Sequence, residues 1–358
     1  MKQVLISFLF IFSSTSYGNS CSTIDLDKDG GSMTNIPPLN QHYTNTCYAH
    51  AGTVMLDAWL HSHGGDKDKM TSPLSAAVFK QASLMSAGMG NLSCEAIEAV
   101  EDYGRCEKKG FDDKVWNEFK LPGRYNKSRR ANDLMELIGA LYVKPPRKGG
   151  SSTSSYMRKK RKWRKENKKN AEMLYCSKDR LHLGTFDSAS FESILNAMNS
   201  VGEKTYYRRM VQALCGDNIE DISDNMPSCE SDLRIRFGGK KRARKYKKKI
   251  HKLLEGNNPQ PIGVGYCSGV LKRGKDFRGY KGGLLGFTSI EAISSAECGL
   301  HESVVIGRAM KNGKCHLKIR NSWGADASYR HWDSDNNGNV WVEEDAFTEN
   351  MGSLTYLE

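Results

Sequence analysis

The N-terminus constrains this chain most, because it decides the redox conditions under which the remaining residues fold. Lys2 is followed by the apolar run "VLISFLFIF" from Val4 to Phe12, and then by small and polar residues up to Gly18. A cationic start, a short apolar run and small residues predict a secretory signal peptide, cleaved after Gly18. The run is too short to anchor the chain in a bilayer. We therefore expect an exported protein, secreted or periplasmic, with no integral membrane segment after cleavage.

Export makes disulfides the expected state of most of the ten cysteines. Cys21 lies at the processed end. Its lipidation is an alternative to which we give less weight, because no Leu stands three residues before it. Cys47 is set apart for the reasons given below. The other eight allow four bridges, and the sequence leaves their pairing open: Cys94, Cys106, Cys176, Cys215, Cys229, Cys267, Cys298 and Cys315.

The net charge of +12 is concentrated in two tracts. Residues 147–169 hold eleven Lys or Arg and one acidic residue, and residues 240–252 hold nine Lys or Arg and no acidic residue. The two windows carry +19, so the rest of the chain carries −7. A mildly acidic body with cationic attachments favours either solvated, partly disordered arms or contact with a polyanion, such as nucleic acid or an anionic cell surface.

Hydrophobic spacing divides the chain into a helical first half and a strand-rich end. Residues 47–60 and 93–104 have helical spacing, whereas short β-rich runs separated by Gly and Asn begin at Pro261. The middle, 112–256, is expected to be a helical insertion with basic, partly disordered arms and helical spacing at 191–214. The pattern predicts an α+β fold with a cleft between its two parts.

Cys47 stands where a polar segment turns into the first helical pattern, in "NTCYAHA". Free backbone N–H groups and the helix dipole at such a position stabilise a thiolate. Gln41, six residues upstream, is a candidate oxyanion donor. His301 opens one later strand, and Asn321 ends another beside Trp323. The carbonyl of an asparagine can accept the N–H of an imidazole, and an indole ring can shield that hydrogen bond from water. Together they predict nucleophilic catalysis, with a buried or bridged thiol as the alternative.

Five ordered segments resemble motifs of the papain-like cysteine peptidases. The stretch "NQHYTNTCYAHA" (40–51) is similar to the family's Q-x5-C-[WY]-A stretch, "HESVVIG" (301–307) to its histidine strand and "NSWG" (321–324) to its asparagine motif. The segments "GKDFRGYKGGLLGF" (274–287) and "GNVWV" (338–342) resemble those before the histidine and after the asparagine. The resemblance covers residues 36–110 and 259–358, about half of the chain.

The resemblance implies a Cys47 nucleophile, a His301 base, an Asn321 that orients the imidazole, and Gln41 in the oxyanion hole. It implies an α+β, two-lobed fold with a helical left half and a β-barrel-like right half. The implied activity is that of a monomeric endopeptidase that hydrolyses protein or peptide substrates through an acyl-enzyme thioester, without cofactor or metal. The expected domains are a signal peptide (1–18), a short N-terminal segment (19–35), the left half (36–111), the helical and basic insertion (112–256) and the right half (257–358).

This sequence departs from the family pattern at several positions. Thr44 stands where a second cysteine is usual, and Glu302 follows His301 where alanine is usual. Since neighbouring strand residues point to opposite faces, Glu302 is expected to face away from His301. No long propeptide separates the signal peptide from Gln41. The alternative function is that of a catalytically inactive papain-like protein that binds polyanions or cell surfaces through its basic tracts.

One further segment matches a metal-binding pattern. Residues 333–344, "DSDNNGNVWVEE", fit the calcium-loop pattern D-x-D-x-N-G-x5-E. We interpret them as a polar turn and strand, with calcium as the alternative, because the same residues fall on the last strand of the family. The positions concerned are Asp333, Asp335, Asn337, Gly338 and Glu344. The pattern at 25–31, "DLDKDGG", is weaker, and His50, one turn after Cys47, is expected to support its helix.

Overall fold

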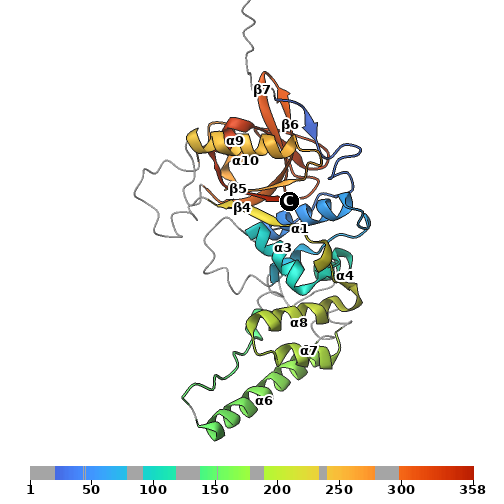
Figure 1. The fold of residues 1–358 in the computed structure, drawn as a ribbon, viewed down its shortest axis with the longest axis vertical. Helices are drawn as coiled ribbons and strands as arrows, with labels where there is room; N and C mark the ends of the chain where they lie inside the picture. The colour runs from blue at the N-terminus through green and yellow to red at the C-terminus, as the bar shows by residue number, and fades with distance from the viewer. Residues whose placement is uncertain are drawn as a thin grey trace, which may run out of the picture.

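The computed structural model describes residues 21–42, 44, 46–78, 92–117, 138–150, 152–177, 189–233, 240–278 and 298–358. An antiparallel sheet lies at one end of the long axis, a first group of helices in the middle, and three further helices at the other end (Figure 1). Helices and an antiparallel sheet from different parts of the chain confirm the predicted α+β class.

The first group of helices surrounds the segment that carries Cys47. It comprises α1 (Cys47–Ser62), α2 (Pro73–Val78), α3 (Leu92–Tyr103) and α4 (Lys108–Asn117). Helix α1 is buried on almost all sides, as expected of a helix that packs against others and against a sheet. Gly52 allows its close contact with α3, since a Cβ there would lie 2.6 Å from the Ser93 carbonyl oxygen. The helices predicted at 47–60 and 93–104 are therefore confirmed.

The sheet is antiparallel throughout and follows an open path. Its order is β4 (Cys229–Leu233), β10 (Met351–Leu357), β5 (Ile262–Cys267), β6 (Leu300–Lys311), β7 (Lys314–Arg320), β9 (Asn339–Glu343) and β8 (Asp333–Ser334), while β1 (Ile24–Asp25) pairs with β6. Within the described residues the end strands β4 and β8 do not pair, so the sheet is not the closed barrel that the resemblance suggested. The strand-rich runs predicted after Pro261 are confirmed.

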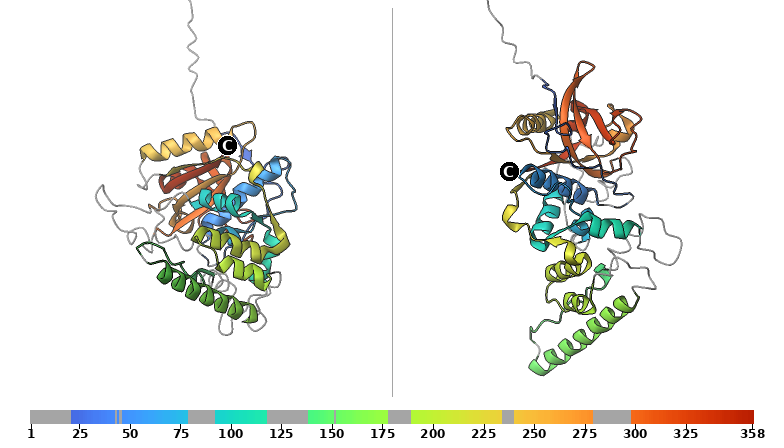
Figure 2. Two further views of the ribbon diagram at one scale, coloured as in Figure 1. Left: turned by 60° about the horizontal axis from the view of Figure 1, so that its bottom comes forward. Right: turned by 90° about the vertical axis from the view of Figure 1, so that its right-hand side faces the viewer.

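Two helices carry the basic tracts that we expected to be partly disordered arms. Helix α6 (Thr153–Ser177) packs on α7 (Phe191–Met198) and, with α8 (Glu203–Cys215), forms the end of the molecule far from the sheet (Figure 2). Helix α9 (Lys240–Leu254) lies against the sheet end beside α11 (Glu344–Glu349). Each has one apolar stripe at helical spacing, and burying this stripe orders a segment whose charge alone suggests disorder. In α9 the stripe is Ala243, Tyr246, Ile250 and Leu254.

The remaining short elements connect these parts. Strands β2 (Arg105–Cys106) and β3 (Ile219–Glu220) form a separate two-stranded sheet. Single-turn helices follow α8 at Gly216–Asn218 and Ser223–Asn225, and α10 (Gly269–Arg273) follows β5. None of the helices in the described part of the chain has the length and apolarity needed to cross a bilayer.

Four disulfides join distant segments of the described chain. They are Cys21–Cys315, Cys94–Cys229, Cys106–Cys215 and Cys267–Cys298. Four disulfides were expected, and this number is confirmed. The set of bridged cysteines differs from the prediction at one position, because Cys21 is bridged while Cys176 is free and exposed on α6. The pairing of β1 with β6 brings Cys21 to the end of the β6–β7 hairpin, where Cys315 lies. A sulfur in a disulfide carries no lipid, which removes the lipidation alternative.

Several predictions fall on residues that the structure does not describe. The signal peptide at 1–18 lies outside the described residues. Of the segment 274–287, only 274–278 is described. They stay predictions.

Candidate active site

Cys47 is the first residue of α1, as the sequence predicted, and its thiol is free and half-buried. Among the described cysteines only Cys176 is also free, and it lies on α6, in the helical end of the molecule. Helix α1 packs against β6, the strand that begins at Leu300. Glu302, the residue after His301, acts on the Cys47 thiol: its carboxylate raises the thiol pKa and its backbone N–H lowers it. The thiol therefore lies beside the strand end that carries the histidine.

His301 and Asn321 come together because β6 and β7 pair as a hairpin. His301 lies near the start of β6 and Asn321 directly follows β7, and the imidazole Nε2 is 2.6 Å from the Asn321 Oδ1. The backbone N–H of Ser322 donates to the same Oδ1 over 2.8 Å, which identifies that atom as the amide oxygen. An oxygen only accepts here, so Nε2 must carry the imidazole proton. Nδ1 is then the ring nitrogen left with a lone pair, as a general base requires.

The Asn321 amide is held from every side by residues that the sequence reasoning did not single out. The Ser303 hydroxyl donates to Oδ1 over 3.1 Å, and Nδ2 donates to the Tyr329 hydroxyl over 3.1 Å. The Ser303 hydroxyl also lies 2.9 Å from that of Tyr266. Ser303 lies two residues after His301 on the same face of β6, so strand alternation was a usable signal for it. Tyr329 follows a turn and gave no such signal.

Two aromatic rings surround the imidazole. The Trp323 ring centroid lies 5.1 Å from that of His301, and the Tyr266 ring meets the imidazole edge-on at 5.7 Å. His301 and Asn321 are both buried. These rings exclude water from the His301–Asn321 hydrogen bond, as we predicted for Trp323.

The thiol and the imidazole are both neutral near pH 7 in this structure. Burial lowers the pKa of His301 to about 4, against the opposing effect of its hydrogen bond to Asn321. Burial and then the charge of Glu302 raise the pKa of Cys47 to about 12, against the opposing effect of three nearby backbone N–H groups. Both pKa directions therefore favour a neutral thiol and a neutral imidazole over a thiolate–imidazolium pair.

Gln41 is fixed between the start of α1 and the end of β7. Its backbone N–H donates to the Ser322 carbonyl over 2.8 Å, and its side-chain Oε1 accepts from the Ser322 hydroxyl. Its Nε2 donates to the Thr44 carbonyl over 2.7 Å, which uses one of the two amide hydrogens. The other hydrogen is available to an oxyanion.

A glycine makes room for the Gln41 segment. Gly324 has φ +91°, and a Cβ there would lie 2.7 Å from the side-chain nitrogen of Asn40. The Gly324 N–H donates to the Leu39 carbonyl over 3.0 Å, and Asn40 forms a β-bridge with Trp323. The "NSWG" turn therefore holds both Asn321 and the strand leading to Gln41.

Glu302 faces away from His301, as strand alternation predicted, but it does not reach solvent. Its carboxylate is buried and accepts a hydrogen bond from the Ser93 hydroxyl of α3. Strand alternation does point it away from the imidazole, but that face of β6 is covered by the helices. Burial raises the pKa of Glu302 to about 7, and its charge acts on Cys47. The departure from the family pattern at this position was the signal that could have identified it.

His50 supports the helix, as predicted. Its Nδ1 lies 2.9 Å from the Thr46 carbonyl oxygen, which only accepts, so Nδ1 carries a proton. Burial lowers the pKa of His50 to about 4, so the ring is neutral. It bridges one turn at the start of α1, directly behind Cys47.

The segment 333–344 forms a strand, a polar turn and a strand, which confirms our interpretation of it. Its acidic side chains serve different partners: Asp333 pairs with Lys311 at 3.0 Å, and Glu344 lies 2.6 Å from His251. Asp335 accepts hydrogen bonds from the backbone N–H groups of Asn337 and Asn339 and lies 3.4 Å from the Lys318 ammonium.

The second calcium-like segment meets the first around a buried ammonium. The Lys318 nitrogen lies 3.0 Å from Asp25 and 3.6 Å from Asp27 as well as near Asp335. A lysine thus occupies the centre of the acidic group that the two sequence patterns form.

One group of metal-ligand types occurs within the described residues. His251, Cys315 and Glu344 place their ligand atoms within 4.8 Å of one another. The Cys315 sulfur is bonded to Cys21, so it is not a thiolate, and His251 and Glu344 bond to each other.

Comparisons with known proteins give a structural likeness only. No family model matches the sequence, and no curated protein matches it. Xylellain, a cysteine protease from Xylella fastidiosa, has a TM-score of 0.41 and 12% identity over 94% of this chain and 85% of its own. PepW from Lactobacillus rhamnosis has a TM-score of 0.43 and 14% identity, over 93% of this chain and 81% of its own. Procathepsin B from Trypanosoma congolense has a TM-score of 0.40 and 10% identity, over 94% and 77%. The proteins to which this chain is similar in structure include papain-like cysteine proteases.

Proposed function

We propose that the chain is an exported cysteine endopeptidase that uses Cys47, His301, Asn321 and Gln41. The observation that carries the proposal is the fixed tautomer of His301, whose Nε2–H donates to Asn321. This leaves the Nδ1 lone pair for a proton, near the start of the strand against which the Cys47 helix packs. The free thiol at the start of α1 supplies the nucleophile.

The proposed reaction begins from the neutral pair. The thiol proton moves to His301 Nδ1 as the Cys47 sulfur attacks the scissile carbonyl carbon and the C=O electron pair moves to oxygen. The Cys47 backbone N–H and the remaining Gln41 amide hydrogen stabilise that oxyanion. His301 then gives its proton to the leaving amine, and a thioester forms. Water, deprotonated by His301, attacks the thioester and releases a carboxylic acid and the thiol.

Asn321 keeps the imidazole in the required orientation through these steps. Its oxygen accepts three donors and its nitrogen donates to Tyr329, so the amide does not rotate freely. As the imidazole gains a proton at Nδ1, the Nε2–H bond to Asn321 strengthens, because the donor becomes charged. Protein or peptide chains are the substrate class that this chemistry serves.

The location proposed for this activity is outside the cytoplasm. Four disulfides within the described residues are consistent with an oxidising compartment. The N-terminal apolar run is the reason for proposing export by a cleaved signal peptide.

The alternative is an inactive protein of the same fold that binds polyanions through its basic tracts. A peptidyl-epoxide thiol probe discriminates between the two. We expect the probe to modify Cys47 of the purified protein, and to modify a Cys176→Ala variant equally, because Cys176 is the other free thiol. A Cys47→Ala variant should lose both labelling and casein hydrolysis. Wild-type protein that neither reacts with the probe nor hydrolyses casein refutes the proposal.

A further inference from the structure

Helix α9 presents a row of cations beside a large groove. Four basic side chains lie four residues apart along the helix, and all four are exposed: Lys240, Arg244, Lys248 and Lys252. This spacing follows one ridge of an α-helix, with about 6 Å between neighbours and about 18 Å from first to last. The groove beside the row has a volume of about 1010 Å³, and all four cations line it.

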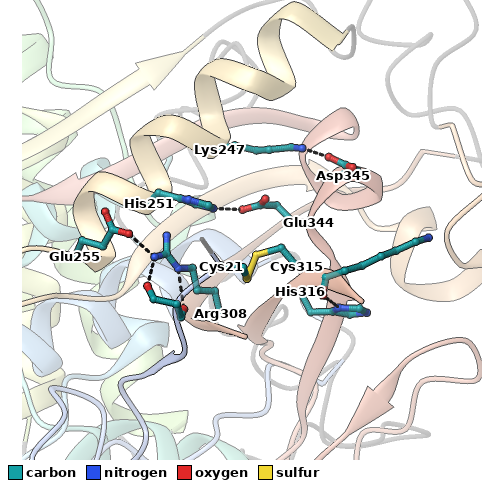
Figure 3. Close-up of a disulfide and its surroundings, with 11 residues drawn as sticks. Cys21, Lys247, His251, Glu255, Arg308, Cys315, His316, Glu344 and Asp345 are labelled. Carbon is teal, nitrogen blue, oxygen red and sulfur yellow. Dashed lines mark hydrogen bonds and ion pairs between the residues drawn. A yellow bond between two sulfur atoms is a disulfide. The ribbon is translucent and has the colours of Figure 1, made fainter. Parts of the chain in front are cut away.

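A second row of α9 side chains lines the same groove and holds the helix in place; it consists of Lys247, His251 and Glu255. Figure 3 shows Lys247 paired with Asp345, His251 with Glu344, and Glu255 with Arg308. On the buried side, the Tyr246 hydroxyl donates to the Gly352 carbonyl over 3.0 Å. These contacts fix the helix to the sheet and to α11, so the first ridge is presented in one orientation.

The acidic residues that line the groove do not neutralise the positive charge of the α9 row. Asp345 pairs with Lys247, Glu255 with Arg308, and Glu349 with Arg278 at 2.9 Å. Each carboxylate is therefore neutralised by a cation outside the row. Within the described residues, none of the four cations of the row forms an ion pair, so the field of the groove is positive.

We infer that this groove binds an anionic polysaccharide, with its sulfate, phosphate or carboxylate groups along the α9 row. A single flexible chain with repeated charges matches a line of cations at about 6 Å intervals. Single-stranded nucleic acid fits less well, because its bases need aromatic side chains to stack on, and Tyr246, the aromatic residue of α9, is buried. This inference goes beyond the proposed peptidase activity and does not depend on it.

The other basic helix provides a matched comparison. Lys159 and Arg161 are exposed on α6, which is also strongly basic but lies at the opposite end of the molecule (Figure 1). Removing two charges from either helix changes the net charge equally. A difference between the two variants therefore reports the groove and not the overall charge of the protein.

The test measures binding of a fluorescent heparin octasaccharide to the full chain by anisotropy. We compare Arg244→Gln/Lys248→Gln on α9 with Lys159→Gln/Arg161→Gln on α6. The α9 variant should bind about tenfold or more weakly at 0.1 M salt, with a smaller salt dependence, whereas the α6 variant should bind as the wild type does. Thermal unfolding and Cys47 labelling should be unchanged in both.

Three results would overturn the inference. The first is no saturable binding of heparin by the wild type at low salt. The second is an equal loss in the α9 and α6 variants, which would mean that net charge alone drives binding. The third is tighter binding of an oligothymidylate than of heparin with the same dependence on α9, which would replace the polysaccharide by nucleic acid.

Discussion

Replacing Glu302 by glutamine isolates the effect of one buried carboxyl beside the proposed nucleophile. The carboxylate lies in the contact between β6 and the helices and accepts a hydrogen bond from Ser93. Glutamine has nearly the same shape, and its amide oxygen accepts the same bond. The substitution therefore removes the titrating group while keeping the packing.

The size of the expected stability change follows from the pKa of Glu302. Burial raises the pKa of Glu302 from 4.5 to about 7, and the nearby Glu95 adds to this. A raised carboxyl pKa means that the folded state holds the proton more tightly than the unfolded state. The associated stability is present below pH 4.5 and is lost as the pH rises through 7. The difference of about 2.5 between these two pKa values corresponds to about 3 kcal/mol in the free energy of unfolding.

The assay is urea unfolding of the wild type and of Glu302→Gln, without reductant, at pH 4 and at pH 8.5. The stability difference in favour of the variant should grow by about 3 kcal/mol between these pH values, because glutamine has no charge to bury. Glu192→Gln, at an exposed position on α7, is the control and should show no such growth.

The same variant also reports on Cys47. Removing the negative charge of Glu302 should lower the pKa of the Cys47 thiol and so speed its alkylation by iodoacetamide at pH 8.5. A variant whose stability and alkylation rate both follow the wild type across the pH range would refute the burial argument for Glu302 and its coupling to the thiol.

Three further predictions concern the site and the acidic cluster. Asn321→Ala should lower kcat by about 10²-fold or more with a smaller change in KM, because the imidazole loses its orienting acceptor; steady-state kinetics on a fluorogenic peptide measures this. His301 acts as a base only when it is neutral, and burial lowers its pKa to about 4. The pH profile of kcat/KM should therefore fall on the acid side with a midpoint near pH 4, and a midpoint near pH 6.5 would contradict this. Lys318→Ala should destabilise the fold by about 3–5 kcal/mol in urea unfolding, because Asp25 loses its buried counter-ion.

The sequence predicted the elements that bear the proposed catalytic residues because their signals are local. A polar segment, Cys47 and an apolar helical pattern define the start of α1, and short β-rich runs separated by Gly and Asn define β6 and β7. The pairing of β6 with β7 then places His301 against Asn321 with no further information. The local sequence patterns and the hairpin pairing were sufficient to predict that His301 and Asn321 lie together.

Features that depend on distant partners were not predictable in this way. Cys21 and Cys315 are 294 positions apart, and only the pairing of β1 with β6 brings them together. The burial of Glu302 depends on Ser93 of α3, which lies two hundred residues earlier in the chain. Likewise, the order of α9 depends on its contacts with α11, since its own composition suggests a solvated arm.

Thr44 explains how the chain manages without the cysteine that the family usually has at this position. Its hydroxyl and its backbone N–H both donate to the Gln41 carbonyl, over 2.6 Å and 3.1 Å, while Gln41 Nε2 donates to the Thr44 carbonyl. These reciprocal bonds fix the turn before α1 by hydrogen bonding, where a disulfide would fix it covalently. They also leave no neighbouring thiol for Cys47. Because disulfide exchange needs a second sulfur within reach, the lack of a neighbouring thiol favours a reduced Cys47, the proposed nucleophile, beside the four bridges of the described chain.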